Sequence, residues 1–293
     1  MSTTPVIEVD RLKLTYGDFP AVRDLSFEVR PGELYALLGT NGAGKTSTLE
    51  VVEGHRRQTS GTVRVFGRSP GDRRVVRPRM GVMLQESGFS PDLTVRESVR
   101  LIGRLTRRSD DVDRVLDLVG LTDRAGRKVA QLSGGEKRRL DFATAVYGTP
   151  ELIVLDEPTT GLDIQSRDAV WTTVDRLREN GATIVLTTHY LEEAQQRADR
   201  IGLMHQGTLH REGTVSELTR SLPAVIQFRL AEPVPLLPLP AAVGADGTVV
   251  IETFALQKDL HDLLGWAQDQ AVELRDLQAG PTRLDDVFRA ITH

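Results

Sequence analysis

The chain has 293 residues, which is enough to bury a substantial core and predicts one large domain with a smaller one. Its hydrophobic content of 39% and charged content of 27% are those of an ordinary globular protein, and a net charge of −4 argues against a nucleic-acid-binding surface over the whole molecule. The absence of cysteine excludes disulfide bonds and thiol chemistry.

The first half of the chain begins with segments that are typical of strands. Residues 6–16 and 25–39 alternate or run apolar with turn residues between them, and residues 60–67 form a further apolar segment between glycines. The start of the chain lacks the charged and apolar regions of a secretory signal, and no apolar run approaches the ~18–20 residues that span a bilayer. We therefore expect no signal peptide or transmembrane segment, so that any role at a membrane requires a partner.

A glycine-rich loop lies between a predicted strand and a predicted helix that ends at Gly54. It fits the pattern G-x-x-x-x-G-K-[ST], in which backbone N–H groups and the helix N-terminus bind phosphates. Lys45 would reach the β- and γ-phosphates of a nucleotide, and Thr46 would coordinate Mg²⁺. The loop comprises Gly39, Thr40, Asn41, Gly42, Ala43, Gly44, Lys45, Thr46 and Ser47.

The region of residues 87–149 has a helical pattern and is predicted to be a helical insertion in a sheet-based domain. Thr94 and Glu97 have the spacing of a capping box. In residues 109–120 the apolar positions repeat with helical period, and we predict Ser109 as the N-cap and Gly120 as the stop.

Polar side chains follow three apolar segments that are predicted to be buried strands. Asp156 ends one such segment and could hold Mg²⁺, while Glu157 could polarise the attacking water. His189 follows another segment, at the edge where open α/β sheets bind ligands. Gln85 follows a third, where its amide could reach Mg²⁺ or water. These alternating strands and helices predict a mostly parallel α/β sheet.

The last part of the chain, residues 222–293, differs in character and is predicted to be a small α+β appendage. A proline-rich stretch separates two strand-like segments, 225–230 and 248–254, and helical patterns cover 257–270 and 282–292. We expect a boundary after residue 221, with the first domain covering residues 1–221.

Seven motifs in this order resemble the nucleotide-binding subunit of ABC (ATP-binding cassette) transporters over roughly residues 6–220. The resemblance implies a P-loop NTPase fold with a mixed sheet core and a helical signature subdomain at about 87–149. It also implies ATP and Mg²⁺ as cofactors. The motifs are Tyr16, Gly39–Ser47, Gln85, "LSGGE" at 132–136, "LIVLDEP" at 152–158, "GLD" at 161–163 and His189.

The resemblance gives roles to residues outside the phosphate loop. Tyr16 resembles the aromatic residue that stacks on adenine, and His189 the histidine that contacts the γ-phosphate. Gln85 resembles the glutamine that links Mg²⁺ to the contact with the membrane subunit, and Asp163 the acid that couples the two sites of a dimer. The loop that closes over the partner subunit's ATP corresponds to Ser133, Gly134 and Gly135.

The C-terminal stretch Leu284–Ile291 looks like the ending of drug- and antibiotic-exporter ATPases of the daunorubicin-resistance type. We therefore expect an ATPase subunit that powers a separately encoded polytopic permease, most simply as a homodimer, for export of a drug, antibiotic or lipid-like compound. Such a subunit would lie peripherally at the cytoplasmic face of the membrane, with no nucleic-acid partner. The alternatives are an importer ATPase and a soluble ABC ATPase that takes no part in transport; an ordinary P-loop kinase would leave the later motifs without a purpose.

Glu136 departs from the family pattern, which more often has glutamine at this position. Ser133 and Glu136 have the spacing of a capping box, in which either residue can serve. Alternatively, the added charge weakens closure over ATP, because repulsion from a phosphate at ~6 Å in an effective dielectric of ~20 is on the order of 3 kcal/mol before screening. The adjacent basic residues, Lys137, Arg138 and Arg139, could offset much of that repulsion.

Overall fold

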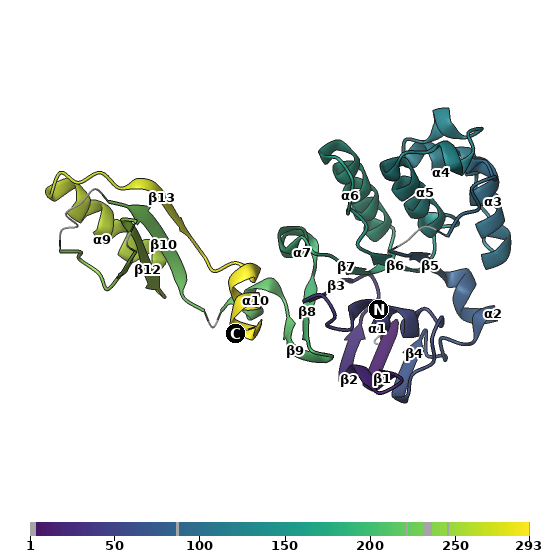
Figure 1. Cartoon of the computed structure of the whole chain (residues 1–293), viewed down its shortest axis with the longest axis horizontal. Coiled ribbons are helices and arrows are strands. Elements are labelled where there is room, and N and C mark those ends of the chain that lie inside the picture. The colour runs from purple at the N-terminus through teal and green to yellow at the C-terminus, as the bar shows by residue number, and fades with distance from the viewer. Residues whose placement is uncertain (1–3, 86–87, 221, 231–235, 245, 293) are drawn as a thin grey trace. The chain divides into compact units, whose positions relative to one another are not determined.

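The structure, a computed structural model, describes residues 4–85, 88–220, 222–230, 236–244 and 246–292 (Figure 1). The chain divides into two compact units, Met1–Thr214 and Val215–His293. This division lies earlier than the expected boundary at residue 221, which is itself outside the described residues. The reason is a short helix, α8 (Val215–Thr219), that packs on the C-terminal helix α10 (Leu284–Thr292).

The first unit is built on a six-stranded sheet. Five strands run parallel and the last is antiparallel to its neighbour, so the sheet is mixed. The strands next to the site are fully buried and mostly apolar, as the apolar runs of the sequence predicted, with polar residues only at the ends of β6 and β7. In order the strands are β5 (Met80–Met83), β6 (Leu152–Asp156), β7 (Thr183–Thr187), β3 (Leu34–Gly39), β8 (Arg200–His205) and β9 (Thr208–Gly213).

A second, three-stranded antiparallel sheet lies on the other side of helix α1 (Lys45–Val52). Its order is β2 (Phe19–Val29), β1 (Ile7–Tyr16) and β4 (Ser60–Val65). Helix α1 contacts strands of both sheets, and Figure 1 shows it between them. Apolar residues of both sheets and of α1 form one buried core. The phosphate loop is therefore held from both sides.

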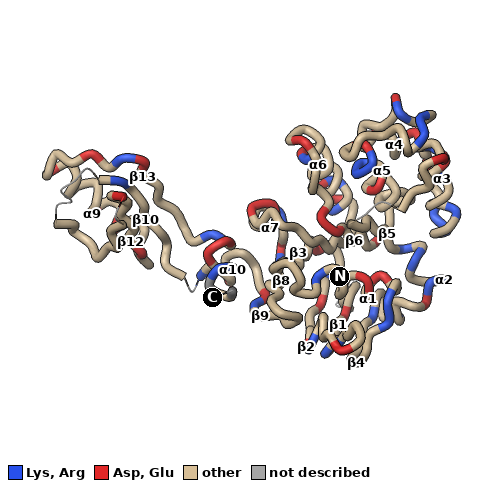
Figure 2. Tube along the Cα trace, viewed as in Figure 1, with Lys and Arg blue, Asp and Glu red and all other residues tan. Residues whose placement is uncertain are grey.

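The helices of the first unit include a group between β5 and β6, as the sequence predicted. Helix α5, the last of the group, packs on β5, the strand that precedes the group (Figure 1). Basic and acidic residues are interspersed along these helices (Figure 2). The group consists of α3 (Val95–Thr106), α4 (Val112–Leu118), the 3-10 turns η2 (Thr122–Arg124) and η3 (Val129–Gln131), and α5 (Gly134–Val146). The remaining helical segments of the unit are α2 (Arg73–Val76), η1 (Arg77–Arg79), α6 (Ile164–Glu179) and α7 (Leu191–Arg197).

Capping signals in the sequence located the starts of α3 and α5 but not that of α4. The capping box of Thr94 and Glu97 at α3 is present. Ser109 is not the N-cap of α4: Asp111 is, and its carboxylate accepts the N–H of Asp113 at 2.9 Å. The preceding Asp110 is held by Arg114 and by the N–H of Gly148, so the chain turns into the helix two residues later than predicted.

Helix α5 is anchored at both ends. Ser133 caps its N-terminus. Near its C-terminus the buried guanidinium of Arg108 donates to the carbonyl oxygens of Thr144 and Ala145, each at 3.0 Å. These carbonyls lie where the helix dipole favours a cation, and burial lowers the pKa of Arg108 to about 10. The arginine thus fixes the last turn of the helix against the start of α4.

The second unit is a four-stranded antiparallel sheet with α9 (Leu256–Asp269) on one face. The strand order is β11 (Ala242–Val243), β12 (Thr248–Thr253), β10 (Ala224–Arg229) and β13 (Arg275–Gly280). A small core of apolar residues from β10, β12 and α9 holds it together. Within the described residues, no helix has both the length and the apolar character that crossing a bilayer requires.

Candidate active site

The phosphate loop connects β3 to α1. At two of its positions only glycine fits, because a side chain would clash with neighbouring backbone. A Cβ on Gly39 would lie 2.5 Å from the carbonyl oxygen of Met204, and one on Gly44 would lie 2.5 Å from that of Ala21. Gly44 also has φ of +96°, a conformation that favours glycine. Residues of the loop and of the first turn of α1 line one cavity.

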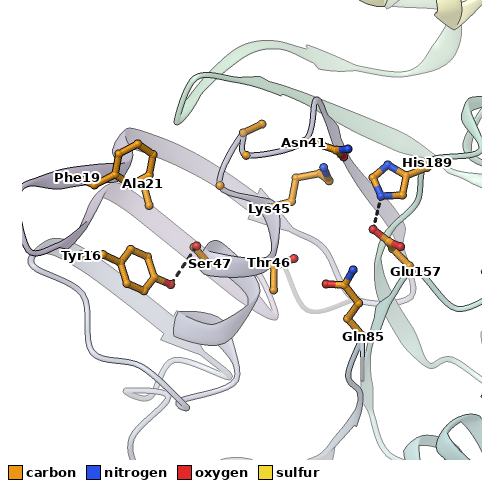
Figure 3. Close-up of a pocket in the computed structure, with 13 residues that line it drawn as sticks. Tyr16, Phe19, Ala21, Asn41, Lys45, Thr46, Ser47, Gln85, Glu157 and His189 are labelled. Carbon is orange, nitrogen blue, oxygen red and sulfur yellow. Dashed lines mark hydrogen bonds and ion pairs between the residues drawn. The ribbon is translucent and has the colours of Figure 1, made fainter. Parts of the chain in front are cut away.

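Lys45 is buried at the base of this loop. Its Nζ donates to the carbonyl oxygens of Gly39 at 2.8 Å and Thr40 at 3.1 Å. Burial lowers the pKa of Lys45, and the carboxylates of Glu157 and Asp156 oppose that shift. The ammonium is therefore held by the loop itself, in the cavity that Glu157 also lines (Figure 3).

The two acids at the end of β6 have different surroundings. Asp156 is buried and accepts a hydrogen bond from the hydroxyl of Thr187. Glu157 has φ of +52°, a strained conformation for a glutamate that costs about 1–3 kcal/mol and is typical of functional sites. Its N–H donates to the carbonyl and the hydroxyl of Thr187, each at 3.2 Å, and its carboxylate forms an ion pair with Nε2 of His189 (Figure 3).

A pair of aromatic residues closes the other end of the site. The hydroxyl of Tyr16 lies 3.1 Å from Oγ of Ser47 and donates to Oε2 of Glu50 at 3.0 Å. The guanidinium of Arg56 lies 4.4 Å from the centre of the Tyr16 ring and covers one of its faces. Phe19, 61% exposed, lines the same cavity. Phe19 and Arg56 could not be predicted from the sequence, since neither belongs to a motif.

These groups surround one cavity of about 400 Å³, which is in the size range of small-molecule sites. It brings together the aromatic end, the phosphate loop and the acid–histidine pair, from segments that are far apart in the sequence (Figure 3). The residues that line it are Tyr16, Phe19, Ala21, Asn41, Gly42, Ala43, Gly44, Lys45, Thr46, Ser47, Gln85, Glu157 and His189.

The remaining expected residues lie elsewhere on the same unit. Within the described part of the chain, the residues that line the cavity do not include Asp163 or the loop of Ser133–Gly135. This loop and the turn before α6 are neighbours, because a Cβ on Gly135 would lie 3.8 Å from Leu162. Asp163 caps α6, where its carboxylate accepts the N–H of Ser166 at 2.7 Å, and this bond lowers the pKa of Asp163. One chain therefore carries two separate groups of candidate residues.

Glu136 forms the predicted capping box and one further contact. Its Oε2 accepts the N–H of Ser133 at 2.8 Å, and its Oε1 accepts Nε of Arg124 at 2.7 Å. The guanidinium groups of Arg138 and Arg139, two of the basic residues that could offset its charge, donate to backbone carbonyls elsewhere. The compensating charge comes from Arg124 in η2, twelve residues earlier.

The site offers oxygen donors of the kind that Mg²⁺ prefers. Thr46 and Gln85 line the cavity, and the carboxylate of Asp156 lies beside it at the end of β6. Across the described residues there is no cluster of three or more His, Cys, Asp or Glu side chains that could enclose a metal. A hydroxyl, an amide and a carboxylate fit a magnesium ion that takes its other ligands from phosphates and water.

The fold and the cavity define a P-loop nucleoside triphosphatase with a helical insertion. Residues 22–160 match the family model described as ABC transporter, and residues 224–282 match that of the C-terminal domain of ABC transporter-like proteins. A solved ATP-binding subunit of an ABC transporter is 26% identical, with a TM-score of 0.69 over 74% of this chain and 92% of that one. A dimeric ATP-binding cassette bound to ADP and phosphate is 25% identical, with a TM-score of 0.66 over 71% and 98%.

Two curated relatives match along nearly the whole length of the chain. The Nod factor export ATP-binding protein I of Paraburkholderia xenovorans is 38% identical over 98% of this chain and 96% of its own. The daunorubicin/doxorubicin resistance ATP-binding protein DrrA of Streptomyces peucetius is 36% identical over 100% and 94%. The chain therefore belongs to the ATP-binding subunits of the ABC transporter family, and it is an ATPase.

Proposed function

We propose that two copies of this chain enclose two ATP molecules and drive a separately encoded membrane permease. The observation that carries this proposal is the division of the candidate residues between two surfaces of one unit. The cavity holds the phosphate loop with Glu157 and His189, while Ser133 and Asp163 lie outside it. A second subunit that presents its own Ser133 loop would complete each site. The dimeric relative bound to ADP and phosphate supports this arrangement.

Within one site, the residues of the cavity have distinct roles. The backbone N–H groups of the phosphate loop and the ammonium of Lys45 bind the β- and γ-phosphates. Glu157 takes a proton from the attacking water, and His189 holds the γ-phosphate and orients the Glu157 carboxylate with which it is paired. Tyr16 stacks on the adenine. Hydrolysis breaks the bond between the β- and γ-phosphates, and departure of the released phosphate removes a group that both subunits bind, so the dimer reopens.

Thr46, Gln85 and Asp156 would hold the magnesium ion beside these groups. When bound, Mg²⁺ neutralises charge on the β- and γ-phosphates. The hydrogen bond from the Thr187 hydroxyl orients the carboxylate of Asp156 for this role. Gln85 also lines the cavity, where its amide can report the presence of the nucleotide to a membrane partner.

The transported compound is a drug, antibiotic or lipid-like molecule that is exported. Two relatives that match most of the chain support this proposal, because one is named for Nod factor export and the other for daunorubicin/doxorubicin resistance. The linearmycin resistance ATP-binding protein LnrL of Bacillus subtilis is 36% identical over 74% of this chain and 72% of its own. A subunit of this kind works at the cytoplasmic face of the membrane, attached through the permease.

The replacement Glu157→Gln tests the proposal. It removes the proton acceptor while keeping the shape of the side chain, so ATP hydrolysis should be lost and ATP should now support a stable dimer in gel filtration. Asp168→Asn, an exposed acid on α6, is a control that should leave both properties unchanged. Unaltered hydrolysis in Glu157→Gln would disprove the role of this residue, and a monomer at saturating ATP would disprove the composite site.

A further inference from the structure

Arg138 joins helix α5, which follows the loop of residues 133–135 (the signature loop), to two strand ends at the active site. It lies in the second turn of α5 and is buried. Its Nη1 donates to the carbonyl oxygens of Leu84 at 2.7 Å and Gln85 at 3.0 Å, and its Nη2 donates to those of Asp156 and Glu157, the latter at 2.6 Å. One guanidinium thus binds four carbonyls from two chain segments.

The guanidinium of Arg138 lies where two neighbouring strands cease to pair. Strands β5 and β6 are paired up to Met83 and Leu155. The residues that follow each strand, Gln85 and Glu157, turn their side chains into the nucleotide cavity. The backbone of these residues has left the β5–β6 ladder, and Arg138 donates hydrogen bonds to carbonyls that this ladder no longer pairs. Its position therefore determines how far apart Gln85 and Glu157 are held.

Glu157 depends on this contact more than an ordinary residue would. Its backbone has positive φ, which persists only where the surroundings hold it. Thr187 fixes its N–H on one side, and Arg138 fixes its carbonyl on the other. Lysine could not replace this arginine, because an ammonium lacks the planar fork that reaches two segments at once.

We propose that Arg138 is a positioning residue that transmits engagement of the signature loop to Glu157 and Gln85 of the same subunit. The inference rests on the proposed function, in which the Ser133 loop at the start of α5 binds the ATP of the partner. When that loop binds the partner's ATP, α5 is held in one position. Arg138 then orients the carboxylate of Glu157 towards the ATP bound in the cavity of its own subunit. The two sites of the dimer then act cooperatively.

The replacement Arg138→Lys tests this role, with Arg108→Lys as the matched control. Arg108 is equally buried and also donates to two carbonyls of α5, but at the far end of the helix and away from the cavity. Arg138→Lys should keep the Kd for ATP within about two-fold, lower kcat at least about ten-fold and bring the Hill coefficient for ATP close to one. Arg108→Lys should lower the melting temperature but leave kcat and the Hill coefficient unchanged.

A second measurement needs no change at Arg138. In hydrogen exchange on the wild-type chain, ATP should protect the first turn of α5 together with the segments around Gln85 and Glu157. Ser133→Ala should remove all three protections at once. Protection of α5 alone, equal kinetic losses in the two arginine variants, or unchanged kinetics in Arg138→Lys would overturn the inference. A dimer that still forms in Glu157→Gln would then show that the proposed function itself stands.

Discussion

Nε of Arg124 lies 2.7 Å from Oε1 of Glu136, so the carboxylate in the signature loop is paired with a cation of the same subunit. The pair matters for function because an unpaired carboxylate at the start of α5 would repel the phosphates of the partner's ATP. We expect Arg124→Ala to raise the ATP concentration needed for dimerisation of the Glu157→Gln protein by roughly ten-fold at low salt. Light scattering at increasing ATP concentration measures this effect.

The pairing predicts that a second change restores the dimer. Glu136→Gln keeps the capping box but removes the charge, so Arg124→Ala should have little further effect in that background. Arg114→Ala, which breaks the ion pair with Asp110 just before α4, is the control and should leave dimerisation unchanged. An equal loss from Arg124→Ala with and without the Glu136 charge would show that Arg124 acts through the fold instead.

Glu136 should also make the stability of the fold depend on acid pH. The hydrogen bond from Arg124, and then that from the N–H of Ser133, lower the pKa of Glu136 from its ordinary 4.5 to about 2. A carboxylate with a lowered folded pKa stabilises the fold above its unfolded pKa, and the stabilisation is lost as pH falls from about 4.5 towards 2. Urea unfolding should show wild type exceeding Glu136→Gln by about 1–2 kcal/mol more at pH 6 than at pH 2.5. A difference in unfolding free energy between wild type and Glu136→Gln that is the same at pH 6 and pH 2.5 would contradict this role for the charge.

The sequence predicted those parts of the site that depend on local spacing. The phosphate loop, the capping box of Ser133 and Glu136, and the polar residues at strand ends each follow from a pattern of a few residues. Parallel strands place their carboxyl ends at one edge, which is why Glu157 and His189 could be expected to meet.

Contacts between segments that are distant in the sequence could not be predicted, because they leave no local spacing pattern. Arg124 is twelve residues from Glu136, and Arg138 binds carbonyls eighteen to fifty-four residues away, so spacing could not reveal either partner. Strand β13 escaped prediction because its side chains are almost all exposed and Leu277 is its one large apolar residue. The start of α4 was placed wrongly because Asp110 and Asp111 offered competing carboxylates whose partners only the fold determines.

The site of Lys45 should reject arginine. Its Nζ is held between the carbonyl oxygens of Gly39 and Thr40 in a buried position that suits a compact ammonium. Lys45→Arg keeps the charge but adds a planar group, so we expect ATP affinity to fall at least about ten-fold. Isothermal titration with ATP measures the change, and Lys13→Arg on the exposed face of β1 should bind as wild type does. Normal affinity in Lys45→Arg would mean that charge alone suffices.

Tyr16 should contribute to binding of the base and not of the phosphates. One face of its ring is covered by Arg56 at 4.4 Å, and its hydroxyl is held by Ser47 and Glu50, so the ring is fixed before the nucleotide arrives. Stacking of a base on an aromatic ring contributes ~1–3 kcal/mol, and Tyr16→Ala should therefore weaken ATP binding by roughly ten-fold. Phe19→Ala should cause a smaller loss, because its exposed ring has no comparable support.

Tripolyphosphate, which has no base, separates stacking from an effect on the phosphate loop. If Tyr16 acts by stacking, Tyr16→Ala should bind tripolyphosphate as wild type does, and Tyr16→Phe should bind ATP nearly normally. The contact with Ser47 offers the other explanation, because loss of the hydroxyl could disturb the loop itself. In that case Tyr16→Ala would weaken ATP and tripolyphosphate equally, and Tyr16→Phe would share the defect. The two ligands measured on the two variants therefore decide which contact of the ring serves the nucleotide.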